Sequence, residues 1–110
     1  MHAFEVLSDP ARRRALELIA QRERASGEIV QVIGAEFGIS QSAVSQHLGV
    51  LRNSGFASVR KEGAKRCYSI NPEGFDNVEA WLKQLRSYWG PKMESLATEV
   101  ERGKRNRRKD

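Results

Sequence analysis

The spacing of apolar residues in the first half of the chain predicts a series of short helices. A short apolar segment from Phe4 to Leu7 predicts the first helix. Asp9 can cap the free amides of a second helix, in which Pro10 takes the first position. The apolar residues of the second helix recur at helical spacing and are Ala11, Ala15, Leu18 and Ile19.

Two further short helices meet at a tight turn. Ser26-Gly27 is expected to end the second helix and to open a third, which closes near Phe37-Gly38. Ser40 then caps a fourth helix. The apolar face of the third helix holds Ile29, Val32 and Ile33, and that of the fourth holds Val44, Leu48 and Leu51. Two helices joined in this way have the spacing of a helix-turn-helix, whose turn favours glycine.

The fourth helix carries no charge, which is unusual for a helix at a surface. No Asp, Glu, Lys or Arg occurs from Gly38 to Leu51. Its outward side chains are Gln41, Ser42, Ser45 and Gln46. Such short neutral donors and acceptors can bond base edges in the major groove of DNA without a large desolvation cost. Burial of this face against a partner protein is the alternative explanation.

The period of the apolar residues shortens after this helix and predicts a β-hairpin. Residues 57–61 and 65–70 alternate as strands do, and they flank Glu62-Gly63-Ala64. The side chains expected to face the core are Val59, Tyr68 and Ile70.

A strongly amphipathic helix is predicted after Asn71-Pro72, which ends the second strand. Its apolar residues are Phe75, Val78, Trp81, Leu82, Leu85 and Trp89. Gly90-Pro91 interrupts the helix, because proline removes a helical hydrogen bond. The predicted fold is therefore mainly α with a β-hairpin, in the order α-α-α-α-β-β-α, which is a winged helix-turn-helix.

The positive charge of the chain is concentrated in two places. The formal net charge is +5, and residues 102–110 carry six basic residues and one acidic residue. We expect a folded domain over residues 1–101 and a basic, disordered tail over 102–110. A second basic segment, 52–66, places cations near the hairpin tip, where a hairpin beside DNA would meet phosphate. A solvated charged face is the alternative explanation for this segment.

Several classes of protein are not expected. The sequence shows no glycine-rich phosphate loop and no nucleophile with a plausible base, so an enzyme is not expected. No apolar run approaches the ~18–20 residues of a membrane span, and the N-terminus does not resemble a secretory signal. The single cysteine, Cys67, excludes a disulfide and an all-cysteine metal site within one chain. A cytoplasmic protein is expected.

Three stretches occur in an order and at a spacing that are typical of one family. They are Phe4 to Arg12, Ile39 to Leu48, and Arg60-Lys61-Glu62-Gly63 through Tyr68-Ser69-Ile70. Together they resemble the ArsR/SmtB-type bacterial repressors. The segment from Trp81-Leu82 to Tyr88-Trp89 also looks like the subgroup of small autorepressors that lack metal sites.

The resemblance implies a homodimer that binds an inverted-repeat DNA operator as a repressor. The first and closing helices would form the dimer, through Phe4, Leu7, Trp81, Leu82, Leu85 and Trp89. The helix-turn-helix residues implied to contact DNA are Ser40, Gln41, Ser42, Ser45, Gln46 and His47. The implied phosphate contacts of the hairpin are Arg60, Lys61, Lys65 and Arg66. His47 falls near the DNA backbone in the family, although a packed helix residue explains it equally well.

The chain departs from the family's metal sensors. At the positions where those sensors place cysteines, this chain has Val30 and Val32, which offer a metal no lone pair. No histidine follows His47, so the closing helix lacks the ligands of the other type of site. We therefore expect no metal and no cofactor, and the sequence names no small-molecule inducer. The alternative functions are a sequence-indifferent architectural DNA protein and a protein-interaction module built on Trp81 and Trp89.

Overall fold

The computed structural model describes residues 2–88 of the chain. The chain divides after Val78 into two units, and each is described by itself. Trp89, the predicted break at Gly90-Pro91 and the predicted tail 102–110 lie outside the described residues. The domain boundary at residue 101 therefore stays a prediction.

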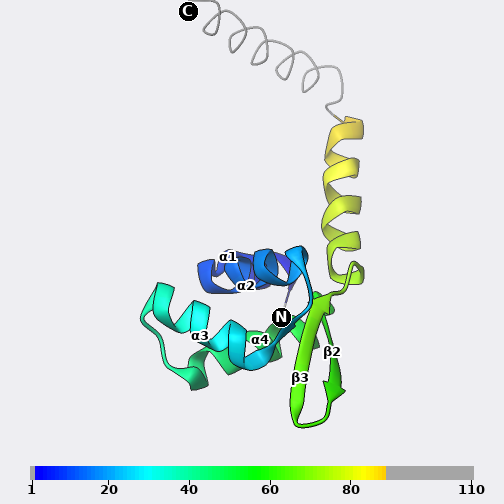
Figure 1. The fold of residues 1–110 in the computed structure, drawn as a ribbon. Helices are drawn as coiled ribbons and strands as arrows, with labels where there is room; N and C mark the ends of the chain where they lie inside the picture. The colour runs from blue at the N-terminus through cyan, green and yellow to red at the C-terminus, as the bar shows by residue number, and fades with distance from the viewer. Residues whose placement is uncertain (1, 89–110) are drawn as a thin grey trace, which may run out of the picture. The chain divides into compact units, whose positions relative to one another are not determined.

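The first unit contains the helices that the apolar spacing predicts (Figure 1). They are α1 (Ala3–Ser8), α2 (Pro10–Gln21), α3 (Ser26–Phe37) and α4 (Gln41–Asn53). Asp9 caps α2 as expected, because its Oδ1 accepts hydrogen bonds from the backbone N–H groups of Ala11 and Arg12 at 2.8 and 3.1 Å. Pro10 occupies the first turn of the same helix.

The turn between α3 and α4 has the predicted helix-turn-helix form. Gly38 ends α3 in the left-handed conformation, with φ 63° and ψ 35°, which a residue with a side chain rarely adopts. Ser40 begins α4, since its Oγ accepts a hydrogen bond from the backbone N–H of Ala43 at 3.1 Å. The sequence therefore specifies both ends of this turn locally.

A three-stranded antiparallel sheet completes the unit. Its strands are β1 (Arg24–Ala25), β2 (Ala57–Glu62) and β3 (Lys65–Ile70), in the order β1-β3-β2. The predicted hairpin is confirmed, with Glu62 paired to Lys65 so that the loop is Gly63-Ala64 alone. The prediction that the second helix ends at Ser26-Gly27 is wrong: α2 ends at Gln21 and β1 follows it. A strand of two residues is too short to show alternation, and only pairing with β3 reveals it.

The core forms where the helices meet the sheet. The predicted buried faces of α2 and α4 are confirmed, as is that of α3 except for Val32, which is half-buried. Phe56, just after α4, is completely buried and packs edge-on against Phe75 with ring centroids 4.9 Å apart. Tyr68 is also buried, while Val59 and Ile70 pack against the core as partly buried residues.

A further helix covers residues 73–88. Its first turn is fastened to the loop after α4, where the backbone N–H of Gly74 donates to the carbonyl of Gly55 at 2.8 Å. Asn71 caps it, since its Oδ1 accepts from the N–H of Glu73 at 3.0 Å. No helix within residues 2–88 is long and apolar enough to cross a membrane.

Candidate nucleic-acid interface

The outward face of α4 is uncharged and open to solvent. Its exposed residues are Gln41, Ser42, Ser45 and Gln46. The other face of the helix holds the buried side chains of Val44, Leu48 and Leu51. Because the buried face fixes the rotation of α4, the four neutral polar side chains point away from the core. Ser40 precedes them and is also exposed, with its Oγ engaged in the helix cap.

The hairpin of β2 and β3, called the wing below, presents exposed cations near its tip. Lys61, Lys65 and Arg66 are exposed, and no ion pair engages their side chains within residues 2–88. Lys61 and Arg66 are cross-strand partners, and Lys65 follows the turn. These side chains can therefore approach a phosphate backbone without breaking an internal contact.

Arg60 differs from the other wing cations because acidic side chains already hold it. Its Nε donates to both carboxylate oxygens of Glu23, at 2.9 and 3.0 Å, and its Nη2 also contacts Glu62 at 3.1 Å. The hydrogen bonds from Arg60 hold the pKa of the Glu23 carboxyl below its usual value. The same contact with Glu23 raises the pKa of Arg60. Arg60 could reach a phosphate only in competition with these carboxylates.

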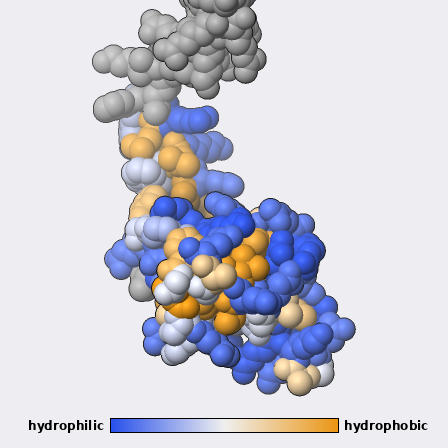
Figure 2. Space-filling view, turned by 60° about the vertical axis from the view of Figure 1, so that its left-hand side comes forward, coloured by the Kyte–Doolittle hydropathy of each residue, from blue (hydrophilic) through white to orange (hydrophobic). Residues whose placement is uncertain are grey.

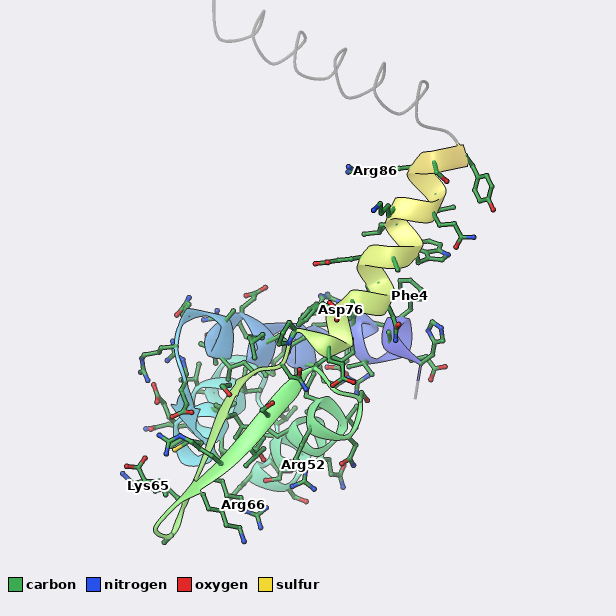
Figure 3. The ribbon with its side chains drawn as sticks, turned by 90° about the vertical axis from the view of Figure 1, so that its right-hand side faces the viewer. Phe4, Arg52, Lys65, Arg66, Asp76 and Arg86 are labelled. Carbon is green, nitrogen blue, oxygen red and sulfur yellow. The ribbon has the colours of Figure 1, made fainter. Side chains whose placement is uncertain are left out.

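Arg52 is a candidate that the sequence prediction left out of the site. It lies in the last turn of α4 and is exposed. Figure 3 places Arg52 on the same lower edge of the first unit as Lys65 and Arg66. Its position within the basic segment 52–66 was the signal that could have identified it.

His47 is half-buried and faces α2. Its side chain is 22% exposed, and its Nδ1 lies 3.3 Å from Nη1 of Arg12. Its Nε2 lies 3.9 Å from Oδ1 of Asp9. Burial raises the pKa of the Asp9 carboxyl, but the N–H groups of Arg12 and Ala11 together with His47 outweigh this effect and leave that pKa below its usual value. The predicted DNA contact of His47 stays a prediction.

The residues predicted for the dimer interface are partly exposed in the single chain. Phe4 of α1 is 41% exposed and Leu7 is half-buried. In Figure 3, Phe4 lies on the opposite side of the first unit from the cationic edge that holds Lys65 and Arg66. A surface at α1 and a surface at the wing could thus be occupied at the same time.

The helix 73–88 carries an exposed apolar stripe of its own. Trp81, Leu82 and Leu85 are 45%, 48% and 38% exposed. Figure 2 shows apolar and polar residues on different sides of this helix, just below the grey residues.

The positions that hold metal ligands in related sensors are occupied by half-buried Val30 and Val32 in α3. Within residues 2–88, no group of three or more His, Cys, Asp or Glu side chains is placed to hold a metal ion. Cys67 is buried in β3, with its Sγ 3.9 Å from Oε2 of Glu62.

Comparison with known proteins identifies the family. Residues 9–59 match the family described as bacterial regulatory protein, arsR family. The HTH-type transcriptional regulator Rv2034 of Mycobacterium tuberculosis is 32% identical over 91 residues, which are 78% of this chain and 81% of that protein. The uncharacterized HTH-type transcriptional regulator Rv0081 of the same organism is 42% identical over 67 residues, 61% of this chain. That match spans only 56% of Rv0081, just over half of its length.

A solved structure agrees in fold. It is the homodimeric winged helix-turn-helix DNA-binding domain Mb0332 of Mycobacterium bovis, a possible ArsR-family transcriptional regulator. It is 26% identical, with a TM-score of 0.58 over 77% of this chain and 75% of that one. The matched residues include the whole helix-turn-helix and the start of the wing. This chain therefore belongs to the ArsR family of bacterial regulatory proteins.

Proposed function

We propose that the chain is a sequence-specific transcriptional repressor that binds an inverted-repeat DNA operator as a homodimer and represses its own gene. The observation that carries this proposal is the outward face of α4, which is exposed and uncharged. An exposed helix without charge is poorly suited to a solvated surface, whereas neutral amide and hydroxyl groups match the donor and acceptor pattern of base edges. We therefore name α4 the recognition helix.

The wing supplies the affinity that the recognition helix lacks. Lys61, Lys65 and Arg66 would neutralise phosphates and release counterions, which favours binding to any DNA sequence. Arg52 at the end of α4 would add a further phosphate contact, because it lies on the same edge of the unit. Base contacts from α4 and phosphate contacts from the wing together make a specific interface.

A homodimer fits the apolar surface of the helix 73–88 and the exposed Phe4 of α1. Soluble monomers rarely leave a contiguous apolar stripe in water. Pairing by a two-fold axis would cover the stripe and set two recognition helices about one turn of DNA apart, ~34 Å. The operator would then be an inverted repeat.

Selection from a library of random-sequence duplexes tests this function. The wild-type chain should enrich one inverted-repeat sequence and bind it ~10³-fold or more tightly than a random duplex at physiological salt. Enrichment of no sequence, with tight binding to all duplexes, would indicate an architectural DNA protein. Binding to no duplex would indicate a protein-interaction module instead.

The sites that the protein occupies in its own cell test autoregulation. Chromatin immunoprecipitation should recover the selected sequence beside the gene that encodes the chain. Recovery of that sequence only at other genes would leave repression in place and remove autoregulation from the proposal.

A further inference from the structure

Arg12 of α2 closes the C-terminal end of α1. Its Nε donates to the carbonyl of Val6 at 2.8 Å, and its Nη2 donates to the carbonyl of Glu5 at 2.9 Å. The last carbonyls of a helix have no partner within the helix, so side-chain donors commonly satisfy them. Two donors of one guanidinium are therefore fixed on α1.

The third donor of the same guanidinium reaches the recognition helix. Nη1 of Arg12 lies 3.3 Å from Nδ1 of His47, a residue 35 positions further along the chain. Because arginine can only donate, Nδ1 must accept, and the ring proton of neutral His47 then lies on Nε2, toward Asp9. The guanidinium is planar and rigid, so fixing two donors on α1 also fixes the direction of the third.

We infer that Arg12 is a positioning residue for the recognition helix, a role that rests on the DNA-binding function proposed above. Through His47 it ties α4 to α1, the helix that carries Phe4 of the proposed dimer surface. Base readout depends on the placement of α4 to within a fraction of an ångström, because hydrogen bonds to base edges weaken steeply with distance and angle. Loss of this tie should therefore reduce the preference for one sequence more than it reduces DNA binding in general.

Arg13 provides a matched control for the effect on α1. Its Nη1 donates to the carbonyls of Leu7 and Ser8 at 2.8 and 3.0 Å, so it also closes the end of α1. Its described contacts stay on α1 and do not extend to α4. Arg12→Lys and Arg13→Lys each keep the charge and lose the fork of donors, but only Arg12→Lys breaks the link to His47.

The test measures binding to the duplex that the wild-type chain selects and to a random duplex of equal length. Arg12→Lys should lose about tenfold in preference, comparable to one lost base contact, while Arg13→Lys keeps the wild-type preference. Both variants should lower the melting temperature by similar amounts. Equal preference in Arg12→Lys and Arg13→Lys would overturn the positioning role. A wild-type chain that selects no sequence would instead overturn the proposed function.

Variants of His47 decide the matter if Arg12→Lys fails to fold. His47→Asn places an amide acceptor near the position of Nδ1, whereas His47→Leu fills similar space without an acceptor. The inference expects His47→Asn to keep more of the sequence preference than His47→Leu. If His47 contacts phosphate instead, His47→Leu should weaken binding to both duplexes by the same factor, and that result would overturn the inference.

Discussion

Ser45 and Gln46 differ from Lys65 in what they can recognise on DNA. The first two are exposed neutral side chains on α4, and the third is an exposed cation at the wing tip. A hydroxyl or amide can distinguish base edges, whereas an ammonium attracts any phosphate. Substitutions at these positions should therefore change different properties of binding.

Ser45→Ala or Gln46→Ala should cost ~1–3 kcal/mol on the selected duplex if a base contact is lost, and much less on random DNA. Lys65→Ala should weaken both duplexes alike and reduce the slope of log affinity against log salt by ~0.9. Titrations at several salt concentrations measure both effects. Equal losses on the two duplexes for Ser45→Ala and Gln46→Ala would remove these residues from base readout.

Asp9 makes the stability of α2 depend on pH. Its pKa is lowered in the folded chain, so its contribution is complete above the unfolded value of ~3.9 and is lost as the pH falls through the folded value. Asn is an equally good N-cap but does not titrate. Asp9→Asn should therefore be less stable at pH 7 by ~0.3–1 kcal/mol, and the gap should close below pH ~4. Urea unfolding at several pH values measures this gap, and a constant gap would assign it to geometry instead of charge.

Single residues also show where sequence reasoning stops. The caps at Asp9 and Ser40 were predictable, because each side chain bonds an amide two or three residues away. The contact of Arg12 with His47 and that of Arg60 with Glu23 join residues 35 and 37 positions apart. No local pattern marks such pairs, so the wing cations looked equivalent until the fold separated Arg60 from the others.

At the scale of elements, helices were predicted better than connections. Each of α1 to α4 buries a face whose spacing is visible in the sequence. The strand β1 was missed, since its two residues gain their structure only from pairing with Tyr68 and Cys67 of β3. The contact between the loop after α4 and the helix 73–88 was missed for the same reason. It depends on Gly74, which the pattern did not single out.

Gly74 allows the helix 73–88 to begin directly against the end of α4. A Cβ added there would lie 2.7 Å from the carbonyl oxygen of Gly55 and 2.8 Å from Cγ of Phe56. Gly74→Ala should therefore destabilise the fold by roughly 1–3 kcal/mol, as overpacking does. Gly49→Ala is the control, because nothing lies within 4 Å of its added Cβ and alanine favours a helix by up to ~1 kcal/mol. Thermal unfolding compares the two, and an unchanged melting temperature in Gly74→Ala would show that the loop yields without cost.

At the scale of the whole molecule, two surfaces must work together. The first unit presents the recognition helix and the wing, and the helix 73–88 presents the apolar stripe of Trp81, Leu82 and Leu85. One recognition helix contacts too few base pairs to distinguish a site in a genome, whereas two helices held by a two-fold axis read both half-sites. Dimerisation and sequence preference should therefore be lost together.

Leu82→Glu tests this link, because Leu82 is 48% exposed in the single chain and glutamate has a helix propensity close to that of leucine. The substitution should leave the helix intact but place a charge in the paired stripe, where burial without a partner is costly. Ala80→Glu introduces the same charge on the far side of the helix, since two residues span about 200° of turn. In sedimentation at micromolar concentration, the wild type and Ala80→Glu should be dimers and Leu82→Glu a monomer that binds the selected duplex no better than a single half-site. A monomeric wild type would exclude the dimer, and a dimeric Leu82→Glu would place the interface elsewhere on the chain.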